Sequence, residues 1–102
     1  MDRKVIASVK RFAKEVRKEF PVKKIILFGS YANGTEREDS DIDVAVIVDK
    51  YNGNIITANG KLFSLVRKID VRIEPILLET QYDKSGFVRS ILRSGKVIFS
   101  AN

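Results

Sequence analysis

The chain has 102 residues, of which 44% are hydrophobic and 31% charged, a balance that fits one globular domain and leaves no length for a second core. It contains neither cysteine nor histidine, which excludes disulfides, thiolate or imidazole metal sites and a histidine general base. The formal net charge of +6 fits an anionic ligand and fits equally a solvated, lysine-rich surface.

The first predicted element is an amphipathic helix. Apolar residues recur at helical spacing from Val5 to Phe20, Asp2 is placed to cap the helix, and Pro21 marks its end. The amino terminus leads directly into this pattern instead of an apolar signal-peptide stretch, and no apolar run reaches the length that spans a bilayer. We therefore expect the protein in the cytoplasm.

Two strands follow, separated by a polar segment. Residues 25–28 form a short apolar run typical of a buried strand, and Gly29 closes it. After the polar segment, residues 41–49 alternate as a strand does. One side of this second strand is apolar throughout, whereas the other side is acidic only at its start.

A helix and a third strand are predicted next. Residues 55–68 carry an apolar helical face, and residues 69–78 then alternate as a strand, in which Pro75 suits an edge or a bulge. The charged residues of this strand would share one face. These residues are Asp70, Arg72 and Glu74.

The chain is expected to end with a short helix and a short strand. Asp83 is placed to cap a helix over residues 87–92, Gly95 follows it, and residues 96–99 form the last strand. There is no internal repeat or linker. The order of elements predicts a single α/β or α+β domain over residues 1–102, with a mixed sheet of about four strands flanked by helices.

The acidic start of the second strand is the most informative feature. Asp41 and Asp43 are two residues apart on a strand, so their carboxylates project from the same face and repel each other unless a cation lies between them. Magnesium prefers such hard oxygen ligands. A pair of this kind also arises by chance in exposed loops and edge strands, so the pair alone does not establish a metal site.

The segment before the pair resolves this ambiguity. Gly29 and Ser30 end a buried strand, where glycine lets a phosphate approach the backbone and the serine hydroxyl adds a hydrogen bond. Ten residues separate Ser30 from Asp41. A phosphate cradle followed by metal-binding carboxylates is what nucleotidyl transfer requires.

Residues 28–43, FGSYANGTEREDSDID, resemble the signature of the DNA polymerase beta nucleotidyltransferase superfamily. Residues 69–72, followed by Pro75, resemble the segment of that superfamily that delivers a third catalytic carboxylate. The resemblance implies a polymerase-beta-like nucleotidyltransferase fold. It also implies an enzyme that uses Mg²⁺ and a nucleoside triphosphate, expected to be ATP.

The resemblance also implies roles for single residues. Asp41 and Asp43 would hold the magnesium associated with the nucleotide, and Asp70 would complete a second metal position, so these three are the expected catalytic and metal-binding residues. Gly29 and Ser30 would bind the β- and γ-phosphates.

Several assignments remain open at this stage. Glu74 is a rival to Asp70 as the third carboxylate. Arg72 is a candidate nucleotide-binding residue or an orienting partner of Asp70, and a surface ion pair is its alternative. Asn33 stands where many relatives carry an arginine that grips the triphosphate, and it would bind phosphate without adding charge. Tyr31 would either stack on the base or pack against the domain.

The small size resembles that of the minimal nucleotidyltransferases, which commonly pair with a helical HEPN protein. This implies an antitoxin that neutralises a HEPN ribonuclease by transferring AMP from ATP to one of its tyrosines. The alternative is a binding-only antitoxin, or a regulatory nucleotide-binding module that acts by contact. A hetero-complex or a homo-oligomer is expected, and direct binding of nucleic acid is not, because no aromatic RNA-binding motif is present.

Overall fold

The structure, a computed structural model, describes residues 3–37 and 39–101. Its helices and strands appear in the predicted order. They are α1 (Arg3–Glu19), β1 (Lys24–Phe28), α2 (Ser30–Asn33), β2 (Ile42–Val48), α3 (Ile55–Ile69), β3 (Ile73–Glu79), the 3-10 helix η1 (Thr80–Tyr82), α4 (Phe87–Ser94) and β4 (Lys96–Ser100).

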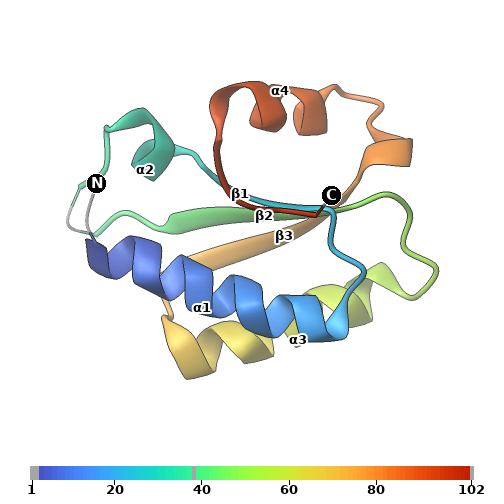
Figure 1. The fold of residues 1–102 in the computed structure, drawn as a ribbon, viewed down its shortest axis with the longest axis horizontal. Coiled ribbons are helices and arrows are strands. Elements are labelled where there is room, and N and C mark those ends of the chain that lie inside the picture. The colour runs from blue at the N-terminus through green and yellow to red at the C-terminus, as the bar shows by residue number, and fades with distance from the viewer. Residues whose placement is uncertain (1–2, 38, 102) are drawn as a thin grey trace.

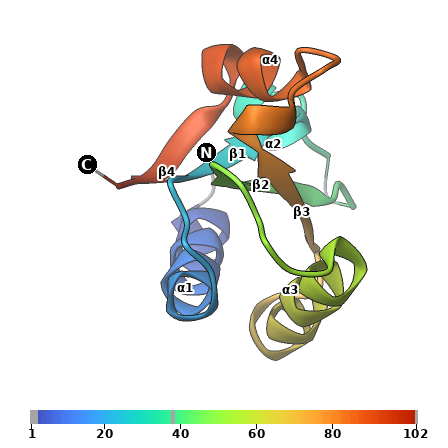
Figure 2. The ribbon, with the colours of Figure 1, turned by 90° about the vertical axis from the view of Figure 1, so that its right-hand side faces the viewer.

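The four strands form one mixed sheet in the order β3-β2-β1-β4. β1 runs antiparallel to both β2 and β4, whereas β2 and β3 are parallel. Helices α1 and α3 cover one face of the sheet, and α2 and α4 lie on the other (Figures 1 and 2). The predicted α/β class and the mixed four-stranded sheet are confirmed.

Two apolar cores arise from the alternation along β2. Its residues on one side are buried in the larger core, under α1 and α3: Ile42, Val44, Val46 and Val48. On the opposite side, Ala45 and Ile47 join the smaller core that α4 covers. Asp43 alternates with the residues of the larger core and lies on this second side, at the start of β2.

The start of β3 differs from the sequence prediction. Helix α3 continues to Ile69, and Asp70 is its C-terminal cap, with the Asp70 N–H donating to the Val66 carbonyl at 2.9 Å. A turn follows, and β3 begins only at Ile73. The prediction of a strand from Ile69 is wrong because Ile69, three residues after Val66, also completes the apolar face of the helix.

Pro75 and the cap of α4 lie where the sequence predicts them. Pro75 lies in β3, an edge strand, as predicted. The Asp83 carboxylate accepts hydrogen bonds from the N–H groups of Val88 at 2.9 Å and Arg89 at 3.1 Å, and so caps α4. Asp2, predicted to cap α1, lies outside the described residues. Within the described ranges, no helix is long and apolar enough to cross a membrane.

Candidate active site

Three side chains form a row across the sheet where β1 ends and β2 and β3 begin. Asp43 on β2 pairs with Phe28 on β1 and with Glu74 on β3. Residues paired across neighbouring strands project from the same face. Glu74 and Asp43 therefore lie side by side on the face that carries α2 and α4, with Asp41 just before β2.

These carboxylates perturb one another. Burial, and then the charge of Asp41, raises the pKa of Asp43. The charge of Asp41 is the main reason that the pKa of Glu74 is raised, and burial, the charge of Asp43 and a hydrogen bond with Asp41 add to it. The cluster is thus a concentration of negative charge, which favours the binding of a cation.

Gly29 forms the turn that follows β1 and lies directly against Asp43. Its φ of +72° is in a region that side-chain-bearing residues rarely adopt, and a Cβ atom there would collide with Asp43 Oδ2. Ser30 begins α2 next to this turn. Within the described part of the chain, the Ser30 hydroxyl makes no hydrogen bond, so it can accept or donate one to a ligand.

The other two candidates on this segment differ in exposure. Asn33 ends α2 and is exposed, and its backbone N–H donates to the Gly29 carbonyl at 3.1 Å. Tyr31 is only 5% exposed and belongs to the larger core. The packing interpretation of Tyr31 is confirmed, because a ring buried to this extent cannot stack on a base.

Asp70 is not brought together with the other carboxylates. The Arg72 guanidinium binds it through two hydrogen bonds, Nε to Oδ1 at 3.1 Å and a terminal nitrogen to Oδ2 at 2.8 Å. These bonds, with a smaller contribution from the hydroxyl of Ser8 on α1, lower the pKa of Asp70. Ser8 lies on α1, which covers the sheet face opposite to the one that carries α2 and α4 (Figure 2), so the side-chain contacts of Asp70 are with Arg72 and with that side of the molecule.

The predicted common face of Asp70, Arg72 and Glu74 is therefore wrong. Asp70 ends a helix, whereas Glu74 is the second residue of β3. Of the interpretations of Arg72, the ion pair with Asp70 is the one that the structure contains. The signal that would have placed Asp70 outside the strand is the spacing of Leu62, Val66 and Ile69, which carries the helix through residue 69 and leaves Glu74 as the first acidic residue of the strand.

The donor set fits a magnesium–nucleotide complex. Among the described residues, no group of three acidic side chains converges as the ligands of one metal ion. Magnesium needs no such group, since it is usually held by one or two carboxylates together with substrate phosphates. Asp41 and Asp43 supply two hard oxygen donors of the same charge, and the Gly29 backbone lies directly against Asp43 because glycine has no Cβ atom.

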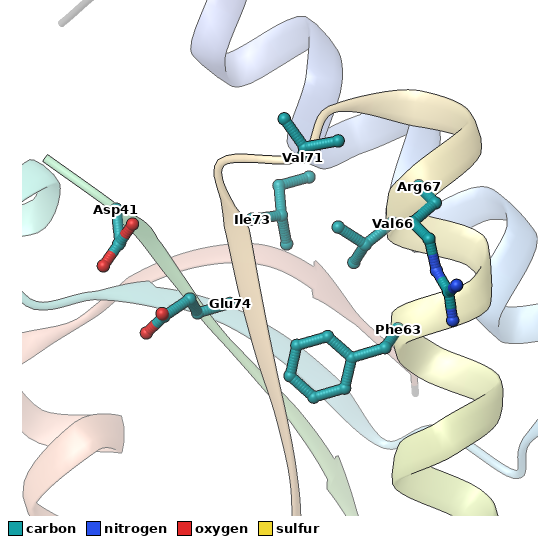
Figure 3. A pocket seen from close by; sticks show the side chains of 7 residues that line it. All are labelled: Asp41, Phe63, Val66, Arg67, Val71, Ile73 and Glu74. Atoms are coloured by element: carbon teal, nitrogen blue, oxygen red, sulfur yellow. The ribbon is translucent and has the colours of Figure 1, made fainter. Parts of the chain in front are cut away.

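Two depressions border the carboxylates on the β3 side. The larger, of about 500 Å³, has a mixed lining: Asp41, Phe63, Val66, Arg67, Val71, Ile73 and Glu74. The second, of about 330 Å³, is lined by Phe28, Asp43, Phe63, Glu74, Pro75 and Ile76. In Figure 3 the Asp41 and Glu74 carboxylates lie on one side of β3, and the apolar side chains lie between β3 and α3. Sequence reasoning did not identify Phe63, which both depressions share with Glu74.

Comparison with known proteins gives a consistent result. The family model described as polymerase beta nucleotidyltransferase matches residues 10–102. A Methanocaldococcus jannaschii protein, named provisionally as a protein adenylyltransferase, is 34% identical over 98 residues, covering 90% of this chain and 95% of the relative. The protein adenylyltransferase MntA of Thermococcus cleftensis is 31% identical over 84 residues, 78% of each chain. A crystal structure of a toxin–antitoxin with AMP-PNP is similar with a TM-score of 0.68 and 25% identity, covering 91% of this chain and 74% of the other.

Proposed function

The chain belongs to the polymerase beta nucleotidyltransferase family, and from this premise we propose that it transfers AMP from ATP to a hydroxyl group of a partner protein. One observation carries the proposal: a glycine turn after β1, a carboxylate pair at the start of β2 and a third carboxylate at the start of β3 lie next to one another across the sheet. The names of the adenylyltransferase relatives support AMP as the transferred group.

Gly29 and Ser30 are proposed to hold the β- and γ-phosphates. The absence of a side chain at Gly29 lets phosphate oxygens approach the backbone, and the hydroxyl of Ser30 has no competing partner in the described chain. Asn33 is exposed at the end of the same short helix and would add a neutral hydrogen bond. Arg72 is not assigned to the nucleotide, because its guanidinium binds Asp70.

Asp41 and Asp43 are proposed to hold magnesium together with the phosphate oxygens of ATP. When bound, magnesium would stabilise the charge that develops on the phosphate oxygens during transfer. We assign the third carboxylate to Glu74 in place of Asp70, since Glu74 pairs with Asp43 in the sheet whereas Asp70 faces α1. Glu74 would take the proton of the acceptor hydroxyl.

The reaction balances without a further reagent. The acceptor oxygen forms a bond to the α-phosphorus, the bond from that phosphorus to the bridging oxygen of the β-phosphate breaks, and pyrophosphate leaves. The acceptor proton passes to Glu74 and then to solvent.

The proposed acceptor is a tyrosine of a helical HEPN-type ribonuclease, for which this chain would serve as the antitoxin. The similarity to a toxin–antitoxin structure supports a partner of this class. Modification of the partner is favoured over contact alone because burial of Asp43 and repulsion among the clustered carboxylates raise the pKa values of Asp43 and Glu74, which lowers the stability of the free protein. A surface that only binds the partner would not need to hold these charges so close together.

The test uses ATP labelled at the α-phosphate, magnesium, and the partner that co-purifies with the chain. We expect label on the partner with the wild-type protein and with Asp49→Asn, an exposed aspartate at the other end of β2. Asp43→Asn should reduce transfer by roughly 100-fold or more. An unlabelled partner that is nonetheless silenced, equally by wild type and Asp43→Asn, would establish the binding-only antitoxin instead.

A further inference from the structure

The phosphate turn and Phe63 lie on opposite sides of the carboxylates. Across the sheet, Gly29 follows β1, Asp43 lies on β2 and Glu74 on β3. Phe63, on α3, then lines the depressions beyond Glu74 (Figure 3). Because neighbouring strands are about 4.8 Å apart, β1 and β3 are separated by about 10 Å. This spacing accommodates a leaving group at one end and an entering group at the other.

The direction of transfer follows from this order. In an in-line displacement the attacking oxygen enters opposite to the leaving group. This inference rests on the proposed function, in which the β- and γ-phosphates lie at Gly29 and Ser30. Pyrophosphate then departs on the β1 side of the carboxylates. The acceptor must then approach from the β3 side, where the depression of about 500 Å³ opens.

We propose that Phe63, Val71 and Arg67 form the binding site of the acceptor, and that they select a tyrosine side chain. Phe63 is 46% exposed and Val71 is 76% exposed, so neither contributes much to the core, and both offer apolar surface to a ligand. Beneath them, Val66 and Ile73 form a buried apolar floor. Arg67, exposed on α3, lies at the rim.

The chemistry of the lining identifies the occupant. The depression has apolar walls on the α3 side, and its acidic groups are the carboxylates of Asp41 and Glu74. A phenol matches both, because its ring can pack on Phe63 while its hydroxyl reaches the carboxylates. A serine or threonine side chain has no ring that could pack on Phe63.

Binding can be tested without catalysis. The ¹⁵N-labelled protein would be titrated with N-acetyl-L-tyrosinamide and, separately, with N-acetyl-L-serinamide. Tyrosinamide should shift the amide resonances of Phe63, Val71 and Glu74 in a saturable way, and serinamide should not. Phe63→Ala should weaken tyrosinamide binding about fivefold. Tyr82→Ala, which removes an exposed aromatic ring beyond the far end of β3, should leave the binding unchanged. Equal shifts with serinamide, or no effect of Phe63→Ala, would overturn the proposal.

Transfer kinetics separate the acceptor from the nucleotide. Val71→Asp should raise the KM for the partner protein about tenfold, because it places a charge on the apolar wall. The KM for ATP should stay within about twofold. The matched control is Val97→Asp, which changes an equally apolar, 49% exposed residue on β4.

The outcomes of this second experiment are distinct. A raised KM for ATP with an unchanged KM for the partner would assign the depression to the nucleoside and overturn this proposal. An unchanged KM for the partner in Val71→Asp, with normal wild-type transfer, would also overturn this proposal alone. Absence of transfer by the wild-type protein to any acceptor would overturn the proposed function and the acceptor site with it.

Discussion

Gly29 and Asp43 lie against each other where β1 ends and β2 begins. The glycine adopts a positive φ and leaves no space for a Cβ atom beside Asp43 Oδ2. Asp43 itself is partly buried next to Asp41, and both effects raise its pKa. The raised pKa means that the charged form of Asp43 costs the free protein stability, as is common for carboxylates at functional sites.

Replacing Asp43 should therefore stabilise the protein in the absence of magnesium. A carboxyl group whose pKa is raised on folding adds stability below its ordinary pKa, and this stability is lost as the pH rises through the raised value. Asp43→Asn removes that loss, so its Tm should exceed that of the wild type at pH 7. At a pH well below the ordinary aspartate value of about 3.9 the two Tm values should converge.

Thermal unfolding in a metal chelator at several pH values measures this difference. Asp49→Asn is the control, since Asp49 is exposed and lies 3.6 Å from Lys23 Nζ, and this variant should gain no stability at pH 7. A lower Tm for Asp43→Asn at neutral pH would contradict the account of the carboxylate cluster.

Asp70 and Glu74, four residues apart, should respond differently to substitution. Glu74→Gln should lower the rate of AMP transfer roughly 100-fold or more, because it removes the proposed proton acceptor. Asp70→Asn should leave transfer nearly intact and reduce the free energy of unfolding by about 1–2 kcal/mol, because it weakens the hydrogen bonds with Arg72.

The effect of Asp70→Asn on the free energy of unfolding should also depend on pH. The pKa of Asp70 is lowered on folding, so its contribution is present above its ordinary pKa and is lost as the pH falls through the lowered value. Denaturant unfolding should show Asp70→Asn and wild type diverging at neutral pH and approaching each other in acid. If Asp70→Asn lost AMP transfer and Glu74→Gln remained active, the third catalytic carboxylate would be Asp70 and not Glu74.

At the scale of the elements, α3 forms despite an unfavourable sequence. Gly60 lies within its first half and lowers its intrinsic helix propensity. The helix is supported instead by the Asn54 cap, whose side chain accepts from the Thr57 N–H at 3.1 Å, and by the burial of Leu62 and Val66. The same helix presents Phe63 and Arg67 beside β3, so its stability bears on the proposed acceptor site.

Gly60→Ala should raise the free energy of unfolding by about 0.5–1 kcal/mol, because alanine loses less backbone entropy on entering a helix. A Cβ atom at Gly60 meets no other atom within 4 Å, so no contact opposes the gain. Urea denaturation measures the change. Gly29→Ala, at a positive φ, is the contrasting variant and should be less stable than wild type. Destabilisation by Gly60→Ala would show that α3 is distorted at this point.

At the scale of the whole molecule, more than half of the positively charged residues lie on two helices. Helices α1 and α3 carry ten of the 19 lysine and arginine residues, seven in α1 and three in α3, against two acidic residues. Both helices lie on the sheet face opposite to α2 and α4 (Figure 2). A net charge of +6 favours the approach of an anionic ligand such as the proposed nucleotide. One residue of this positive charge, Arg67 on α3, lines the same depression as Asp41 and Glu74.

The position of the site on the sheet also suits a large acceptor. The carboxylates lie at the end of the sheet next to β3, which is an edge strand. A protein side chain can therefore reach Glu74 from the β3 side without entering the domain. This openness is consistent with a macromolecular acceptor and with the proposed entry beside Phe63.

The sequence by itself determined the order of the elements, the α/β class and the family, because local periodicity and the spacing of Gly29, Ser30, Asp41 and Asp43 depend only on neighbouring residues. Tertiary structure alone showed that Glu74 lies beside Asp43, which is the basis of its proposed role as the third carboxylate, and it alone showed that Phe63 lines the depressions next to Glu74. Residues 69–73 satisfy both a helical and a strand pattern, and the pairing of β3 with β2 sets which acid lies beside Asp43. The boundary between α3 and β3 depends on which of these residues pack into the core with the helix and which pair with β2. Those contacts join residues that are distant in the chain, so the local pattern does not determine them.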